Sequence, residues 1–544
     1  RSAVIDSLIE HVGEARAAVE DILARAQAAV GRDVTRNRRI LAEAIDAEQH
    51  RLHALAWLAT YAETFRSLAG YAERLAQAGR FGETEQLLVQ IALGEYLCQV
   101  AGGIPMNQQE FARLADLGLG ADDAAVLHRG GAGTLMRHGN SPAARARLVE
   151  LMAAAQGALT VGDCGLDDTL EQMRVEMRRF VEDKVAPFAH RWHLDNAYVP
   201  MEVVEELAGL GVFGLTLPEE YGGLGLGKEA MCVVSEELSR GYIAVGSLGT
   251  RSEIAAELIL HGGTPEQKRH WLPRLASGEV LPTAVFTEPN TGSDLATLAT
   301  RAVRDNDVWK VTGNKTWITH PVRADLMTML VRTDPGERGY RGLSMLLAPK
   351  PRGSDADPFP AEGMSGSEIE VLGYRGMKEY EIRFEAFEVP ADGLLGGVEG
   401  QGFKQLMQTF EAARIQTAGR AVGVAQNALD LALAYAQDRR QFGKPIVAFS
   451  RVLSDSEALV VANTGAQPFS GAVIVDRDLN PPGRLVRNAD SNLGTEGGAT
   501  ARLVKYRQVE IIRDRQYRGK GEGRIPHGCR QLAEHAQQVS PAPD

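Results

Sequence analysis

Apolar residues change their spacing twice along the chain, and these changes divide it into three parts. Residues 1 to about 150 carry apolar side chains at helical intervals, for example at Leu41 and Ile45. From Leu281 to about Leu395 the spacing becomes alternating, and from Gly402 the interval of about 3.6 residues returns. Helices bury every third or fourth residue and strands every second. The pattern therefore predicts helices, a β-rich insert and helices again.

Within the alternating part, runs rich in apolar, branched and aromatic residues predict individual strands. A further hairpin is expected where Val303 and Trp309–Val311 flank Asp305–Asp307. Another helix is expected to start at Pro265–Gln267, and an uninterrupted helix of about 35 residues is expected from Gly402. The four main predicted strands are Leu281–Phe286, Leu326–Val331, Leu343–Leu347 and Ile382–Val389.

The stretch Ala284–Thr319 combines a strand, a polar loop and a returning hairpin. The loop, Glu288–Asp294, is dense in Asn, Gly, Ser and Asp, which expose backbone N–H groups and tolerate tight turns. Trp317 follows beside two Thr hydroxyls. This combination suits a flat ring with polar edges better than a phosphate, and an ordinary polar hairpin is the alternative.

The predicted fold class is α+β, with a boundary in the glycine-interrupted stretch Ala153–Asp168. Four domains are predicted at this length. They are an N-terminal helical extension (1–155), a helical domain (167–280), a middle β domain (281–397) and a C-terminal helical domain (398–544) that becomes atypical after 452.

Composition narrows the function classes. The chain of 544 residues has 44% apolar and 24% charged residues and a net charge of −12. The negative charge argues against general nucleic-acid binding, and no apolar run reaches the ~18 residues of a membrane span. We therefore predict no nucleic acid and no membrane among its partners.

The cysteines and histidines predict neither disulfides nor a metal site. Four cysteines are scattered without CxxC pairing, and His50 and His53 lack a second pair of ligands. Cysteines without disulfide pairing are typical of proteins in a reducing cytosol, so a cytoplasmic location is expected.

Two glycine-rich motifs would indicate a nucleotide-binding site, but the chain matches neither of them fully. Gly222-x4-Gly227-Lys228 matches a phosphate loop, but Glu229 stands where magnesium coordination needs Ser or Thr. A carboxylate there would repel phosphates, so a turn between helices is the preferred interpretation. No GxGxxG opens a βαβ unit, so a Rossmann cofactor is not indicated.

Five motifs in order resemble those of the acyl-CoA dehydrogenase family, over about residues 167–452. They are PEEYGGLG (218–225), FTEPNTGSD (286–294), NKTWIT (314–319), FEVPADGLLG (387–396) and DRRQFGKPI (438–446). The resemblance implies an FAD enzyme of the acyl-CoA dehydrogenase-like fold, usually a homodimer or homotetramer.

The N-terminal block, including AEQHRLHALAWLATY and GEYLCQVAGGIPM, lies outside the ordinary family pattern. It resembles the extension of bacterial (2S)-methylsuccinyl-CoA dehydrogenases of the ethylmalonyl-CoA pathway. The implied reaction is α,β-desaturation of a short branched or dicarboxylic acyl-CoA, here (2S)-methylsuccinyl-CoA to mesaconyl-CoA. The implied electron acceptor is electron-transfer flavoprotein.

The resemblance also implies roles for individual residues. Phe286, Thr287, Gly292, Ser293, Trp317, Ile318 and Thr319 would hold the flavin, with Ser293 also meeting the CoA pantetheine. Arg439, Gln441 and Phe442 would reach the pyrophosphate and adenosine end of the FAD of a neighbouring subunit. Glu411 and Arg414 would bind the CoA nucleotide, with a helix-surface ion pair as the alternative.

A dicarboxylic substrate requires a cationic or hydrogen-bonding partner for its far carboxylate. Arg251, in SLGTRSE ahead of the β-rich insert, is the candidate, and an ordinary helix-end arginine is the alternative.

No catalytic base is identifiable. The family's Glu-Gly-Thr or Glu-Gly-Ala element is absent, its nearest echo being Glu496, and the alternative position on the long helix is Ala413. The tail after Val452 is a diverged domain with a relocated base, an altered sequence, or part of a non-dehydrogenating member of the fold.

Two further classes stay open. An acyl-CoA oxidase or flavin monooxygenase of the same fold would use O₂ directly. A flavin-carrying protein that binds DNA or a partner would use tail residues such as Arg502, Lys505 and Arg507, although interleaved acidic residues favour a solvated surface.

Overall fold

The computed structural model describes residues 3–107, 109–155 and 162–438, and the backbone of short stretches at 446–453, 456–463, 473–474 and 511–512. The chain divides into two compact units, residues 1–434 and 435–544. Helices and a seven-stranded sheet make up the first unit, which confirms the predicted α+β class. The domain limits given above stay predictions.

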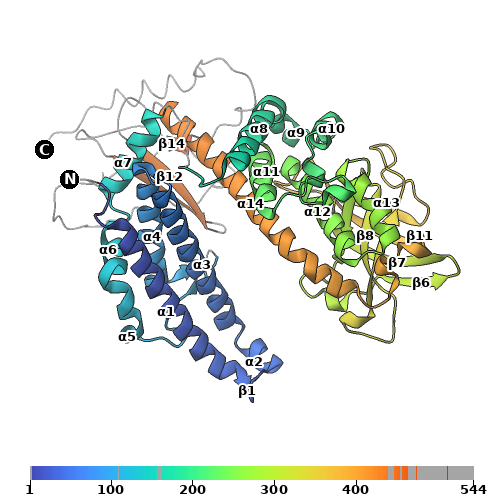
Figure 1. The fold of residues 1–544 in the computed structure, drawn as a ribbon, viewed down its shortest axis with the longest axis horizontal. Coiled ribbons are helices and arrows are strands. Elements are labelled where there is room, and N and C mark those ends of the chain that lie inside the picture. Colours follow the sequence, from blue (N-terminus) through green and yellow to red (C-terminus); the bar gives the residue numbers. More distant parts are fainter. Residues whose placement is uncertain are drawn as a thin grey trace. The chain divides into compact units, whose positions relative to one another are not determined.

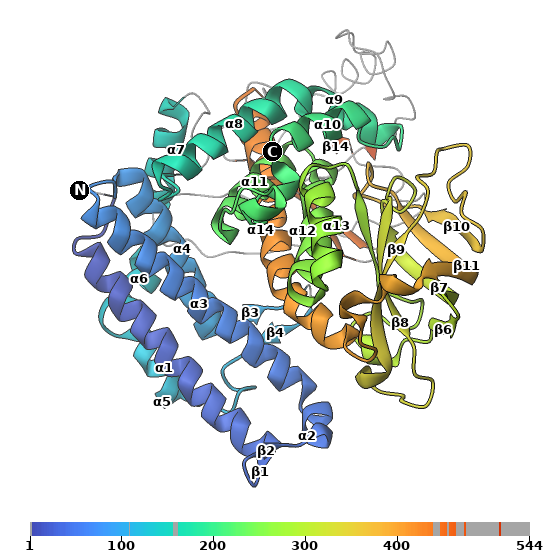
Figure 2. The same ribbon diagram turned by 45° about the vertical axis from the view of Figure 1, so that its right-hand side comes forward.

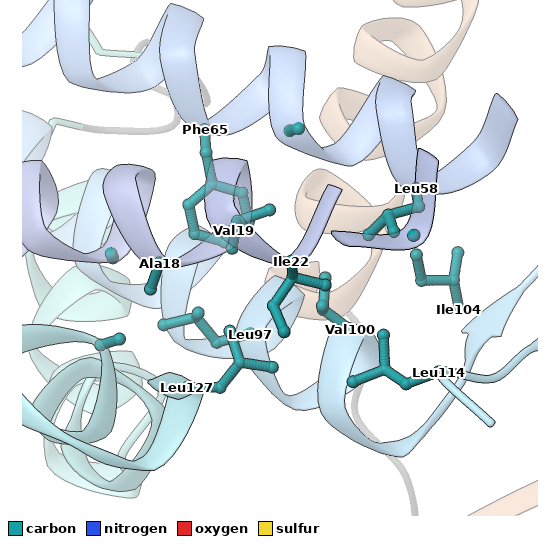
Figure 3. Close-up of a cluster of buried hydrophobic side chains, with 14 of the residues drawn as sticks. Ala18, Val19, Ile22, Leu58, Phe65, Leu97, Val100, Ile104, Leu114 and Leu127 are labelled. Atoms are coloured by element: carbon teal, nitrogen blue, oxygen red, sulfur yellow. The ribbon is translucent and has the colours of Figure 1, made fainter. Parts of the chain in front are cut away.

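The N-terminal block is a helical bundle with a core of its own (Figure 1). Three long helices pack side by side, and Phe65, Ile22, Leu58 and Leu97 are fully buried between them (Figure 3). The helices are α1 (Leu8–Val34), α2 (Ala42–Ala47), α3 (Gln49–Gln77), α4 (Glu83–Gly102), α5 (Ala121–Ala124), α6 (Gly130–His138) and α7 (Pro142–Ala154). Two short two-stranded ribbons complete it, β1 (Thr35–Arg36) with β2 (Arg39–Ile40) and β3 (Ile104–Pro105) with β4 (Phe111–Ala112).

A second helical group follows and has a separate core. The start predicted at Pro265 is confirmed, because Thr264 Oγ1 accepts a hydrogen bond from Gln267 N at 3.2 Å and Gln267 Oε1 accepts one from Thr264 N at 3.0 Å. The helices are α8 (Asp168–Lys184), α9 (Ala186–Leu194), α10 (Met201–Gly209), α11 (Lys228–Gly241), α12 (Ile243–Gly262) and α13 (Pro265–Ala276).

The segment Gly222–Gly227, which resembles a phosphate loop in sequence, is a turn before α11, and Lys228 forms ion pairs within the protein. Lys228 forms ion pairs with Glu253 and Glu257 of α12, and Glu253 also accepts a hydrogen bond from Thr216 Oγ1 at 2.5 Å. A lysine paired with two carboxylates has no free charge for a phosphate.

The sheet runs in the order β10-β11-β7-β6-β8-β5, with β9 paired to β8. Strand β8 reads as a continuous apolar run because both faces of the sheet are covered there. Helices α12, α13 and α14 lie against one face of the sheet (Figure 2). Leu326 and Leu330 pack with residues of these helices, and Met327 and Met329 pack in the core of the opposite face. The strands are β5 (Pro282–Val285), β6 (Arg301–Asp305), β7 (Val308–Thr319), β8 (Leu326–Arg332), β9 (Leu343–Pro349), β10 (Met364–Ile369) and β11 (Glu379–Pro390).

The long helix predicted from Gly402 is confirmed as α14 (Gly402–Asp438). Beyond it, β12 (Ile446–Leu453) and β13 (Ser456–Asn463) pair antiparallel, where we predict a helical domain from the family resemblance. These segments are rich in Val, Leu and Ile, which favour strands. The remaining described pair, β14 (Val473–Ile474) and β15 (Ile511–Ile512), is parallel.

Two glycines allow a close crossing inside the N-terminal bundle. A Cβ on Gly94 of α4 would lie 2.8 Å from Leu135 O and 2.9 Å from Asn140 N, and a Cβ on Gly139 would lie 2.4 Å from Gln90 O. Real Cβ atoms do not approach backbone so closely, so α4 and the end of α6 can meet only through glycine.

We expect Gly94→Ala to destabilise the bundle by about 1–3 kcal/mol, the usual cost of overpacking. Gly13→Ala in α1 is the matched control, because its Cβ meets nothing within 4 Å; it should be neutral or stabilise by up to about 1 kcal/mol. Hydrogen exchange of the α1–α6 amides measures both effects, and equal protection in the two variants would contradict the close crossing.

Candidate active site

The loop after β5 is folded around one carboxylate. Glu288 accepts hydrogen bonds from Ala299 N at 2.7 Å and Thr300 N at 2.8 Å, and its own backbone pairs with Thr291. A carboxylate that accepts several backbone N–H bonds fixes the course of the loop that supplies them. The polar turn 289–294 is thereby held in place while its residues, apart from Thr291, stay exposed.

A fully buried lysine joins this loop to the sheet. Lys315 Nζ donates to Phe286 O at 2.8 Å and to Leu330 O at 2.9 Å, and it lies 3.0 Å from Glu288 Oε1. The ammonium group therefore connects the loop to β7 and β8, and all its partners are acceptors.

The two charges shift each other's titration. Burial lowers the pKa of Lys315 to about 8, against the raising effect of Glu288. Burial would raise the pKa of Glu288, but the Lys315 charge and the N–H groups of Ala299 and Thr300 outweigh it, so this pKa lies below its usual value. The pair is consequently ionised at neutral pH.

A β-bulge in β7 turns Trp317 out of the strand. Lys315 pairs with Ile382 and Ile318 with Tyr380, so two residues of β7 face the single residue Glu381. Trp317 adopts a left-handed backbone with φ of 56°, and its side chain is 56% exposed although its neighbours in the strand are buried. A bulge of this kind re-aims one side chain, and here it presents an indole ring at the surface.

The exposed ring lies next to the loop. Thr316 N donates to Thr287 O at 2.9 Å, so the bulge and the start of the loop are directly bonded. Ile318 and Thr319 follow as buried residues. The structure thus brings together five of the predicted flavin residues, Phe286, Thr287, Trp317, Ile318 and Thr319, at one end of β5 and β7.

The other predicted residues fall into three groups. Gly292 and Ser293 lie on the exposed turn of the same loop. Glu411 and Arg414 are exposed on α14, and the structure shows no ion pair between them. Arg439, Gln441 and Phe442 lie outside the described residues.

Helix α14 meets the loop through an aromatic contact. The rings of Phe286 and Phe410 are 6.2 Å apart and nearly perpendicular, and the Arg414 guanidinium lies 5.8 Å from the centre of the Phe410 ring. The predicted nucleotide-binding residues therefore stand one helical turn from the loop. Ala413, in contrast, packs partly buried against the core and offers no carboxylate.

Sequence reasoning missed the buried polar residues behind the site. Glu379 is only 5% exposed and accepts a hydrogen bond from Thr319 Oγ1 at 3.0 Å, and His320 is only 2% exposed. Lys315 and Glu288 were missed as a pair. The available signal was a charged residue at an inward position of a strand, as for Glu379 in EYEIRF.

Burial and nearby cations shift the pKa values of Glu379 and His320. Burial raises the pKa of Glu379 to about 7, against the lowering effects of Thr319 and Arg251. Burial also lowers the pKa of His320 to about 3, assisted by the charges of Arg323, Arg352, Arg251 and Lys350. Arg251, in α12, is partly exposed, and its buried Nε has no hydrogen-bond partner.

The chain matches three models of one family in succession. They are the acyl-CoA dehydrogenase N-terminal domain at residues 167–279, the middle domain at 283–387 and the C-terminal domain at 400–459. Together with the relatives below, these matches show that the chain belongs to the acyl-CoA dehydrogenase family. The predicted resemblance is confirmed, and the chain is an enzyme of that class.

Among curated relatives, the (2S)-methylsuccinyl-CoA dehydrogenase of Cereibacter sphaeroides is 59% identical over 82% of this chain and 81% of its own. The glutaryl-CoA dehydrogenase of Desulfococcus multivorans is 36% identical over 52% of this chain and 71% of its own. A crystal structure of a Mycobacterium smegmatis glutaryl-CoA dehydrogenase in complex with FADH2 is 29% identical, with a TM-score of 0.45, over 51% of this chain and 67% of that chain.

The geometry fits the flavin that members of this family use. An exposed indole beside a loop with exposed backbone N–H groups and hydroxyls offers a flat apolar surface and polar edges in one place. Isoalloxazine has the same two properties. No helix in the described part of the chain is long and apolar enough to cross a membrane, and these residues contain no cluster of His, Cys, Asp and Glu suited to a metal.

We expect Lys315→Met to destabilise the loop and sheet by about 3–5 kcal/mol, because it leaves Glu288 buried without its counter-charge. Lys310→Met on the same strand removes only an exposed pair with Asp305, and it should cost less than about 1 kcal/mol. Hydrogen exchange of residues 308–332 and the FAD content of the purified variants are the measurements. Unchanged protection in Lys315→Met would refute this role of the ion pair.

Proposed function

We propose that this enzyme is an FAD-dependent (2S)-methylsuccinyl-CoA dehydrogenase that forms mesaconyl-CoA. The observation that carries the proposal is the 59% identity to a relative of that name, extending over four fifths of both chains. It is supported by a cation, Arg251, close enough to the end of β7 to shift the pKa of buried groups there. A monocarboxylic acyl chain has no use for such a charge.

FAD would be held by the residues around the bulge, and it supplies the acceptor for the substrate's β-hydride. Trp317 would pack against the ring, with Ile318 and Thr319 alongside and Phe286 and Thr287 at its edge. Gly292 would line the turn at the flavin, and Ser293 would lie where the flavin and the CoA pantetheine meet. Arg439, Gln441 and Phe442 would bind the adenosine end of the FAD of a second subunit.

The remaining residues would bind and orient the thioester. Removing an α-proton requires a carboxylate base and donors at the thioester oxygen, where enolate charge develops. The base stays unassigned, because Ala413 excludes the position on α14. Glu411 and Arg414 would hold the CoA nucleotide, and the contact of Arg414 with Phe410 places that charge within one turn of the flavin loop.

Arg251 would bind the far carboxylate of the substrate. A guanidinium presents several N–H donors in a plane and pairs with a carboxylate through two bonds. Its buried Nε lacks a hydrogen-bond partner in the structure, so a donor is free for such a ligand. Electron-transfer flavoprotein as acceptor, a homodimer or homotetramer, and a cytoplasmic location complete the proposal.

The direct test is anaerobic addition of (2S)-methylsuccinyl-CoA to the purified holoenzyme. We expect the flavin absorbance near 450 nm to bleach, and to bleach more slowly with butyryl-CoA, which lacks the far carboxylate. Bound FAD that bleaches with neither substrate would contradict the dehydrogenase proposal. Rapid reoxidation of the bleached flavin by O₂ would favour the oxidase alternative.

Arg251→Gln should lower kcat/KM for methylsuccinyl-CoA by about 10–100-fold, since a hydrogen bond to a charged group contributes about 1.5–3 kcal/mol. The value for butyryl-CoA should stay the same. Arg269→Gln is the control, because Arg269 pairs only with exposed Glu266 on α13. An equal loss for both substrates in Arg251→Gln would show a structural role instead.

A further inference from the structure

Glu379, the first residue of β11, carries a buried carboxyl group with only one of its oxygens hydrogen-bonded. Glu379 stands directly opposite Thr319 in the β7–β11 pairing, and its Oε2 accepts the Thr319 hydroxyl at 3.0 Å. Its Oε1 is buried with no donor. A buried carboxyl oxygen without a partner carries a desolvation penalty, so a ligand that bonds to it removes that penalty.

A second buried group beside it is also unsatisfied. His320 follows Thr319, its backbone N donates to Lys378 O at 3.0 Å, and its Nε2 has no partner. Because burial lowers the pKa of His320 to about 3, its ring stays neutral at working pH. The unsatisfied atoms of Glu379 and His320 thus lie at the ends of two paired strands, next to a predicted flavin residue.

The charges that face Glu379 are few. Arg251 of α12 is the cation that lowers its pKa, and Thr319 of β7 is its hydrogen-bond donor. Lys350, whose burial lowers its pKa to about 8, acts on His320 and donates to Pro351 O at 2.9 Å. Neighbouring Lys378 pairs with Glu368 at 3.2 Å. Glu379 is therefore the carboxyl group of this cluster that changes charge near neutral pH, and Lys350 is the amine that does so at a slightly higher pH.

Charge balance shows what a dicarboxylic ligand would do here. Without a ligand, ionised Glu379 and Arg251 sum to zero. Adding the substrate's carboxylate leaves one net negative charge in a buried site, which is strongly unfavourable. Uptake of one proton from solvent restores neutrality and turns Glu379 from a second anion into a hydrogen-bond donor.

We propose that Glu379 is a specificity-determining residue that shares a proton with the far carboxylate of the bound acyl-CoA, with Arg251 as their common cation. This inference rests on the proposed function, because it requires a dicarboxylic substrate. A carboxylate–carboxylic acid pair bound to one guanidinium is neutral, and it selects against acyl chains that end in a methyl group, which leave Glu379 Oε1 unpaired.

The test compares two ligands that differ only at the far end. Mesaconyl-CoA carries a carboxylate where tiglyl-CoA carries a methyl group, and neither can reduce the flavin. Dissociation constants are measured on the holoenzyme from the change in the flavin spectrum between pH 6 and 8.5. For mesaconyl-CoA the constant should rise as pH passes about 7, approaching about tenfold per pH unit because one proton is bound with the ligand. For tiglyl-CoA it should show no such rise.

Glu379→Gln supplies a permanent neutral donor, so it should bind mesaconyl-CoA with a constant that no longer rises with pH. Glu368→Gln is the matched control, because Glu368 lies on the neighbouring strand β10 and bonds to Lys378 and Asn196; it should keep the wild-type pH dependence. Glu379→Asp should retain part of that dependence.

A measurement on the unaltered enzyme covers the case in which Glu379→Gln does not fold. Calorimetric titration with mesaconyl-CoA in buffers of different ionisation enthalpy should show uptake of close to one proton per site near pH 8, and tiglyl-CoA should show none beyond that of its CoA part. Equal pH dependence for the two ligands, or equal proton uptake, overturns the proposal. If methylsuccinyl-CoA still bleaches the flavin in that case, only the role of Glu379 fails; if it does not, the proposed function fails first.

Discussion

The buried ion pair between Lys315 and Glu288 is the interaction on which the site depends. It lies between the loop after β5 and the centre of β7, and it also reaches β8 through Leu330 O. An ammonium group is costly to bury, and the structure meets this cost by surrounding it with three acceptors. The loop that we propose to face the flavin is therefore held from behind by charge, which leaves its outer face free to bind.

The polar groups on the two sides of the site differ in whether they have bonding partners. Behind the loop, Lys315 and Glu288 are bonded to each other and to backbone groups, which fixes the geometry there. Near the ends of β7 and β11, Glu379, His320 and Arg251 of α12 keep unpaired atoms in buried positions. An enzyme that needs a rigid cofactor seat and a responsive substrate pocket is expected to show this contrast, because unpaired buried groups raise the energy of the empty site and lower that of the filled one.

The sequence predicts the architecture far better than the chemistry of the site. Runs of apolar, branched and aromatic residues located β8, β9 and β11, and helical spacing located α14, because these elements bury one or both of their faces. β10 escaped notice since Ser365, Gly366, Ser367 and Glu368 form a polar edge strand with no alternation. The bulge at Trp317 and the pairing of Glu379 with Thr319 depend on register between strands 60 residues apart, which local patterns do not contain.

Trp317 carries a wider consequence. A left-handed backbone at a residue with a bulky side chain costs about 1–2 kcal/mol, and an exposed indole recovers little of this in the free chain. Selection for thermal stability alone would accordingly replace Trp317, by glycine above all, and would improve the apoprotein while removing the proposed flavin surface. At Trp317, therefore, selection for thermal stability and selection for catalytic turnover are expected to favour different residues.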